Sequence, residues 1–119
     1  MAKLYKINPD GIVVVREQAE LDWDKMKLLI NSHDDITIEH VTVIWKGLVA
    51  HMFVDEEGRM HHLLPNPKAT RIYYNFVYKR EGRLDLLYDD LSQPAKLTGL
   101  ESPGFDIVGT AVLLEGPFT

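Results

Sequence analysis

Hydrophobic and polar residues alternate near the start of the chain, and this alternation predicts a β-hairpin. Residues 3–7 alternate, residues 8–11 form an Asn-Pro-Asp-Gly turn, and residues 12–15 are all β-branched. The proline of the turn presets φ at the second turn position, and its glycine tolerates positive φ. We therefore expect a hairpin over residues 3–16.

The pattern changes to a helical period over residues 21–30. The apolar side chains that fall on one side of this helix are Leu21, Met26, Leu29 and Ile30. Asp22 and Asp24 suit the positive N-terminal end of such a helix. The polar residues 31–35 are expected to end it.

The middle of the chain predicts a three-stranded antiparallel meander. The expected elements are strands over 36–45, 48–54 and 59–64, a tight turn at Lys46-Gly47 and a second turn over 55–58. Because side chains alternate across a sheet, one face of the first two strands is apolar and should face the core. Its members are Val41, Val43, Trp45, Leu48, Ala50, Met52 and Val54.

A second helix is predicted to begin at Asn66. Asparagine is a favoured N-cap, and Pro67 suits the first helical position. Apolar residues then recur at three and four residue spacing, so residues 67–79 should be helical. The side chains expected to face the core are Ala69, Ile72, Tyr73, Phe76 and Val77.

The last third of the chain is less regular. Residues 83–91 could form a short strand or a helical turn, and residues 92–104, with two prolines and two glycines, predict a loop. Residues 105–114 predict a strand with a possible bulge at Gly109. Together these elements predict one α+β domain over residues 1–119. Exposed strand edges in so small a domain lead us to expect a homo-oligomer.

Composition narrows the classes of function. The 119 residues include 18 acidic and 13 basic side chains and no cysteine, for a formal net charge of −5. The missing cysteines exclude disulfides, thiolate zinc sites and a cysteine nucleophile. The acidic balance argues against extended nucleic acid as a partner. Because no apolar run approaches the roughly 20 residues of a membrane span, and no signal sequence is evident, we expect a cytoplasmic protein without a membrane partner.

Three histidines form the first candidate site. A two-residue turn at 46–47 and a four-residue loop at 55–58 would place His40, His51 and His62 on one face of adjacent strands. Three close imidazoles could bind zinc or another divalent metal. The alternative, a partly solvated polar face without metal, is the one that we expect, because a slip of one residue disperses the set.

The start of the second helix is the second candidate site. The first N–H groups of a helix lack internal partners and lie at its positive end, so they suit an anion. Lys68 and Arg71 add two cations there, where helix stability alone would favour acidic residues. These residues predict a site for a phosphate or carboxylate group. Asn66 and Thr70 fit either this site or a purely structural cap.

Aromatic side chains on the same helix form the third candidate. Tyr73 and Phe76 are assigned to the core, whereas Tyr74 and Tyr78 share the other side at i and i+4. An exposed tyrosine pair could stack on a base or anchor a protein interface. The alternative is that both tyrosines pack beneath the connection formed by residues 80–105.

Catalytic signatures are missing from the sequence. Glu56 and Glu57 lie in a turn, and Asp89-Asp90 has no identifiable partner, so no paired-carboxylate site is predicted. The chain has no nucleophile elbow, zinc-protease, phosphate-loop or dinucleotide-binding pattern. We therefore expect neither an enzyme nor a bound cofactor.

Several short motifs occur in the order of a known family. They are Glu39, Glu56-Glu57-Gly58, Leu64-Pro65-Asn66, Ala69-Thr70 and residues 106–112, Asp-Ile-Val-Gly-Thr-Ala-Val. In this order the chain resembles a small domain of unknown function (the domain of unknown function 3846 type) found in phages, plasmids and bacterial genomes. The resemblance covers most of the chain and implies an accessory protein of a mobile element, acting in the cytoplasm of its bacterial host by binding.

These observations lead to one preferred function and two alternatives. The preferred one is a non-enzymatic accessory protein that sequesters a small anionic, nucleotide-like ligand between protomers as an anti-defence factor. Its binding residues would be Asn66, Lys68, Thr70, Arg71, Tyr74 and Tyr78. One alternative is a protein-directed inhibitor of a host protein, acting through a sheet edge or the tyrosine-bearing helix. The other is a His-dependent metal hydrolase.

Overall fold

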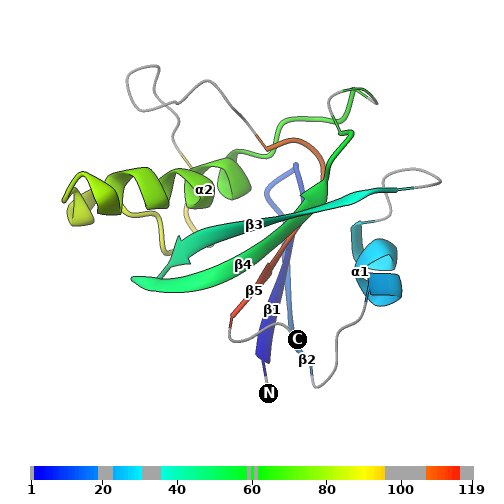
Figure 1. Cartoon of the computed structure of the whole chain (residues 1–119), viewed down its shortest axis with the longest axis horizontal. Coiled ribbons are helices and arrows are strands. Elements are labelled where there is room, and N and C mark those ends of the chain that lie inside the picture. The colour runs from blue at the N-terminus through cyan, green and yellow to red at the C-terminus, as the bar shows by residue number, and fades with distance from the viewer. Residues whose placement is uncertain are drawn as a thin grey trace.

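The structure, a computed structural model, describes residues 2–18, 23–30, 36–58, 60, 62–95 and 107–115. Within them, a five-stranded antiparallel sheet in the order β2-β1-β5-β4-β3 carries helix α1 on one face and helix α2 on the other (Figure 1). The elements are β1 Ala2–Ile7, β2 Val13–Gln18, α1 Trp23–Ile30, β3 Ile38–Trp45, β4 Leu48–Asp55, α2 Pro67–Arg80, the 3₁₀ turn η1 Leu84–Leu86 and β5 Ala111–Leu114. The predicted α+β fold is confirmed.

Both predicted tight turns form. The Asn8 N–H donates to the Ile12 carbonyl at 3.0 Å, and Gly11 takes the positive φ of 90° that its turn requires. In the second turn Lys46 and Gly47 have φ values of 52° and 80°, the left-handed pair that suits a two-residue hairpin. The expected register between β3 and β4, with Trp45 opposite Leu48, follows from it.

The expected third strand of the meander is wrong. Of residues 59–64, the structure describes 60 and 62–64, and none of them lies in a strand. His62 has a φ of 54°, which a strand does not accommodate, and β5 takes the place beside β4. All four β5 side chains are buried, so β5 contributes apolar side chains to both faces of the sheet. The segment 59–64 is more polar and could not do so.

The segment that leads from β4 to α2 packs closely around Leu63. A Cβ added to Gly109 would lie 2.7 Å from the Leu63 Cδ1 atom, and one added to Gly58 would lie 2.8 Å from Val108 Cγ2 and 3.3 Å from Leu63 Cδ1. The chain then passes Pro65, which forms an isolated bridge with Val108, and enters α2 at Asn66.

Two hydrophobic clusters lie on the two sides of the sheet. The cluster beneath α2 is the larger and comprises Tyr5, Ile7, Val43, Trp45, Ala50, Met52, Val54, Ala69, Ile72, Tyr88, Ile107, Ala111 and Leu113. The cluster beneath α1 comprises Leu4, Met26, Ile30, Ile36, Phe53, Val112 and Leu114. The predicted core face of β3 and β4 is largely confirmed, although Leu48 is 73% exposed at the end of the hairpin.

Helix α2 begins at the predicted residue and buries Ala69 and Ile72 as expected, but its buried surface is wider than predicted. Tyr74 and Tyr78 are buried, which confirms the alternative that they pack beneath the following connection and contradicts the exposed ligand-binding pair; Phe76, which the helical spacing assigns to the core, is half exposed. The physical reason is that the chain after α2 folds back onto the helix. Asn75 donates to the Tyr88 carbonyl and accepts from the Tyr88 N–H, both at 2.8 Å, which covers the side that periodicity alone assigned to solvent.

In the described part of the chain, no helix has the length and apolar character needed to cross a membrane.

Candidate functional site

A cleft opens between the tip of the β1–β2 hairpin, the first turn of α2 and residues 91–95. It consists of two adjoining pockets of about 450 and 350 Å³, which share Gly11, Lys68 and Ser92 as lining residues. The three chain segments that meet here are far apart in the sequence. We call this site the Lys68 cleft, because that side chain lies where the two pockets join.

The Lys68 ammonium is held in place by backbone. Its Nζ atom donates to the Gly11 carbonyl at 2.9 Å and to the Leu91 carbonyl at 2.6 Å, and the side chain is half-buried. An ammonium group has three N–H donors, so two carbonyl acceptors leave one donor for another group. Lys68 therefore joins the hairpin tip to the 91–95 segment and keeps a positive charge fixed in the wall of the cleft.

Two acidic side chains lie near the Lys68 ammonium and partly offset its positive charge. Asp90 accepts from the hydroxyl and the N–H of Ser92, at 2.6 and 3.0 Å. These two hydrogen bonds hold the pKa of Asp90 below its usual value, and the positive charges of Lys68 and Lys46 lower it further. Asp10, which also lines the cleft, accepts from the Ile12 N–H at 2.9 Å. The cleft thus carries one fixed cation, with the Asp10 carboxylate in its wall and the Asp90 carboxylate near the Lys68 ammonium.

One wall of the cleft is apolar. Tyr5, Val13 and Val15 lie on the same face of β1 and β2 and line the smaller pocket with Leu91. Val15 is 50% exposed, so this wall is open to solvent. The Lys68 cleft therefore offers an apolar surface and a fixed positive charge side by side.

Two of the predicted site residues have structural roles. Asn66 is fully buried: its Nδ2 donates to the Ile7 and Gly109 carbonyls at 2.9 and 2.8 Å, and its Oδ1 accepts from the Ala69 N–H. Thr70, also buried, exchanges hydrogen bonds with the backbone of Ile107. Although Asn66 lines the larger pocket, both side chains serve to fix α2 to the sheet.

The remaining predicted residues lie apart from Lys68. Arg71 donates to the Tyr78 hydroxyl and, at 3.1 Å, to the Leu86 carbonyl, and its guanidinium lies over the Tyr78 ring at 4.7 Å. This cation faces η1 rather than the cleft. Tyr74 and Tyr78 are 0% and 1% exposed, so neither presents a ring on which a base can stack.

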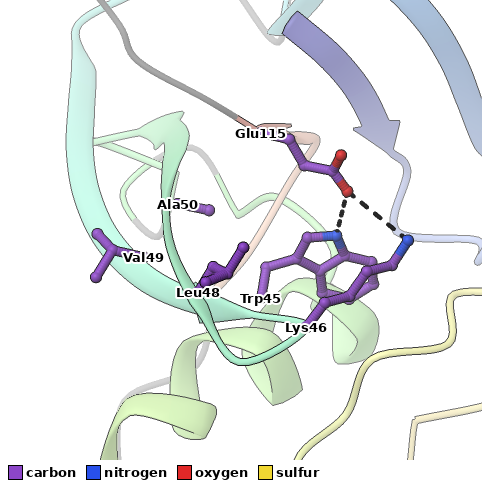
Figure 2. A pocket seen from close by; sticks show the side chains of 6 residues that line it. All are labelled: Trp45, Lys46, Leu48, Val49, Ala50 and Glu115. Atoms are coloured by element: carbon purple, nitrogen blue, oxygen red, sulfur yellow. Dashed lines mark hydrogen bonds and ion pairs between the residues drawn. The ribbon is translucent and has the colours of Figure 1, made fainter.

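A second, smaller pocket of about 160 Å³ lies at the turn between β3 and β4 (Figure 2). The Glu115 carboxylate accepts from the Trp45 indole at 2.7 Å and from the Tyr5 hydroxyl at 2.8 Å, and Lys46 lies 3.8 Å away. Burial, followed by the hydrogen bond and charge of Glu115, raises the pKa of Tyr5 to about 12. Because all three groups converge on the Oε1 atom of Glu115 and tie it to β1 and β3, we interpret the group as the anchor of the end of β5.

The histidines gather only in part. His40 Nε2 and His51 Nδ1 are 2.8 Å apart on the expected face of β3 and β4, and the His40 ring stacks on Phe53. Burial and the neighbouring His40 lower the pKa of His51. His62 lies outside any strand, so the predicted set of three is wrong. Among the described residues, no group of three or more histidine or carboxylate side chains is placed to hold a metal ion.

Comparison with protein-family models, with curated proteins and with solved structures finds no match to this chain.

Sequence reasoning found Lys68 but missed the residues that surround it. Gly11 and Leu91 contribute only backbone carbonyls, which any residue type carries, and they lie 57 and 23 positions from Lys68. The turn glycine was recognised for its backbone conformation, and no local pattern connected it to a lysine in α2. The apolar wall had one usable signal, the β-branched run 12–15 in an edge strand.

Proposed function

We propose that this protein is a non-enzymatic binding protein whose Lys68 cleft takes a small molecule with one negatively charged group and an apolar body. The observation that carries the proposal is the Lys68 ammonium, fixed by two backbone carbonyls where the two pockets join. A cation held in advance costs a ligand less side-chain entropy than a freely rotating one. A carboxylate or phosphate oxygen fits its remaining N–H donor.

The charge of the cleft favours a ligand with a single anionic group. Asp10 and Asp90 lie close to Lys68, and both would repel additional negative charges. The apolar wall of Val13 and Val15 would cover a hydrocarbon or aromatic portion of the ligand. A phosphate monoester or a fatty carboxylate meets both conditions better than a nucleoside triphosphate.

An accessory role in a bacterial host, directed against host signals, belongs to the same proposal. It is supported by the resemblance of residues 56–58, 64–66 and 106–112 to the phage and plasmid domain. A binding protein that removes a small anion from the cell is one way for such an accessory protein to act.

Isothermal titration tests the ligand class directly. The probes are acetate against hexanoate, and inorganic phosphate against phenyl phosphate, AMP and ATP. We expect hexanoate to bind more tightly than acetate, and phenyl phosphate more tightly than inorganic phosphate, because each has an apolar body. We also expect AMP to bind more tightly than ATP. Lys68→Ala should weaken the best probe at least tenfold, because it removes the fixed cation.

Lys79→Ala is the matched control. Lys79 is also a lysine of α2 that donates to a backbone carbonyl, that of Gly47 at 3.0 Å, but it is exposed and does not line the cleft. It should leave binding unchanged. Absence of binding by every probe, or equal affinities of wild type and Lys68→Ala when both are folded by circular dichroism, would contradict the proposal.

A further inference from the structure

Strand β2 forms one edge of the sheet and has few of the features that protect an edge strand. Its first three residues are valines, of which Val14 and Val15 are 36% and 50% exposed, and Ile12 just before it is 61% exposed. Edge strands are commonly protected by charged side chains, prolines or bulges. Strand β2 has no proline and pairs with β1 in an unbroken register, and its two charges, Arg16 and Glu17, lie in its second half. Among the described residues, β1 is the only strand that pairs with β2.

The backbone groups that face the open side of β2 can be assigned. The Asn8 N–H donates to the Ile12 carbonyl, and the Glu115 N–H of the β5 side donates to the Lys3 carbonyl. Hydrogen bonds alternate along an antiparallel pair, so the even-numbered residues of β1 bond to β2 and the odd-numbered ones to β5. On β2, Val13, Val15 and Glu17 therefore direct their N–H and C=O groups away from the sheet.

A second copy of this strand fits that edge in one register better than in the others. A two-fold axis at Val14 sets each Val13 opposite the partner's Val15, so outward backbone groups meet outward backbone groups. Val14 then lies opposite the partner's Val14. The β-branched side chains pair with one another on both faces of the extended sheet.

Charge favours the same register. With the axis at Val14, Arg16 lies opposite the partner's Ile12, and the valines of the two strands separate the two Arg16 side chains. Moving the axis to residue 15 brings the two Arg16 side chains into a diagonal pair, and moving it to residue 16 sets them directly opposite. Both alternatives place like charges together.

We propose that a second copy of this chain docks on β2, antiparallel across a two-fold axis at Val14, and extends the sheet of five strands to ten. This interface is distinct from the binding of a ligand in the Lys68 cleft, although Val13 and Val15 also form the wall of that cleft. Each protomer would therefore carry its cleft beside the shared strand pair.

Disulfide trapping tests the register, because the chain has no cysteine of its own. In the proposed pairing Val14 occupies a non-hydrogen-bonded position, where facing Cα atoms are about 4.5 Å apart, within the range that a disulfide spans. Val14→Cys should therefore form a covalent dimer when oxidised with copper phenanthroline. Val15→Cys should cross-link poorly, because its partner position is residue 13.

Val49→Cys and Val14→Lys complete the experiment. Val49 is 63% exposed in β4, away from the proposed interface, and its cysteine variant measures cross-linking by random collision. Val14→Lys sets two ammonium groups opposite each other and should convert the dimer seen by sedimentation into a monomer, with an unchanged circular dichroism spectrum. A wild-type monomer at every concentration would overturn the proposal. So would a dimer that persists in Val14→Lys, or cross-linking that favours position 15 or 49.

Discussion

The two faces of the sheet are held by different kinds of interaction. On the α2 face, buried polar side chains supplement the hydrophobic contacts: Asn66, Thr70 and Asn75 each bond to backbone of a distant segment. On the α1 face, a hydrophobic cluster forms around Met26 and Ile30. The buried polar side chain at its margin, Asp55, accepts from the Glu57 N–H, only two residues along the chain. Hydrogen bonds fix direction, whereas apolar contacts fix only proximity. The face that must position a cleft is the one with the directed contacts.

The length of the two helices extends the comparison. Helix α2 has 14 residues and an N-cap, whereas the structure describes eight residues of α1. Helices shorter than about 12 residues have little stability of their own, so α1 depends on the contacts of its buried face. We expect α1 to be the part of the fold that opens at lower cost, and the Lys68 cleft to persist when it does.

The largest loss of stability is expected from Asn66→Ala. The substitution removes the helix cap and leaves the buried carbonyls of Ile7 and Gly109 without a donor, for a cost of about 3–5 kcal/mol in unfolding free energy. Urea unfolding followed by circular dichroism measures it. Asn66→Asp should be nearly as damaging, because it keeps the cap acceptor but loses both donors. A loss below about 1 kcal/mol in Asn66→Ala would show that these buried hydrogen bonds add little to the stability of the α2 face.

A smaller loss is expected from Met26→Ala on the other face. Met26 is fully buried, and its truncation leaves a cavity that costs about 2–4 kcal/mol. The matched control is Leu28→Ala in the same helix, where the leucine is 73% exposed and the change should stay within about 0.5 kcal/mol. Equal effects of the two substitutions would mean that α1 is not held by its buried face.

The smallest effect at neutral pH is expected from Tyr5→Phe, and it should depend on pH. Losing the hydroxyl bond to Glu115 costs about 1 kcal/mol. Because the pKa of Tyr5 is raised from 10 to about 12 in the folded protein, its stabilising effect is complete below pH 10 and is lost as the pH rises towards 12. The difference between wild type and Tyr5→Phe in urea unfolding should therefore shrink between pH 10 and pH 12.

Tyr88 provides the comparison for this experiment. Burial, followed by the charge of Asp90, raises its pKa to about 12 as well, and it belongs to the same α2-face cluster. Tyr88→Phe should therefore remove a second part of the alkaline loss. The described α1-face cluster contains no tyrosine, so the loss should be confined to one face. An alkaline loss that survives both substitutions would contradict that assignment.

Much of the fold could be predicted because its elements are specified locally. The two hairpin turns contain residues that require their backbone conformations, and Asn66-Pro67 marks the start of α2 in the sequence. The third meander strand failed because β5, which pairs with β4, lies more than 50 residues further along the chain. Local alternation cannot distinguish which of two segments fills the same place in a sheet.

The candidate site was predictable only in its charged residue. Lys68 was recognisable as a cation at the start of a helix, but the carbonyls that hold it have no signature in the sequence. For Tyr74 and Tyr78 the sequence left two interpretations, an exposed pair or burial beneath the connection after α2, and the structure confirms burial. Burial by a loop is a tertiary effect that helical periodicity does not contain.

The packing of Leu63 links two glycines that stand 51 positions apart. Gly58 and Gly109 both lack the space for a Cβ because of this leucine and Val108. These positions should therefore change as a group: among variants selected for folding, alanine at 58 should be accompanied by a smaller residue at 108, because Val108 Cγ2 is the atom nearest to the added Cβ. Gly109 should change more rarely, because its φ of 75° penalises any side chain. Gly58 and Gly109 belong to two separate parts of the sequence motif, residues 56–58 and 106–112. Both glycines would then be required by one packed cluster rather than for two unrelated reasons.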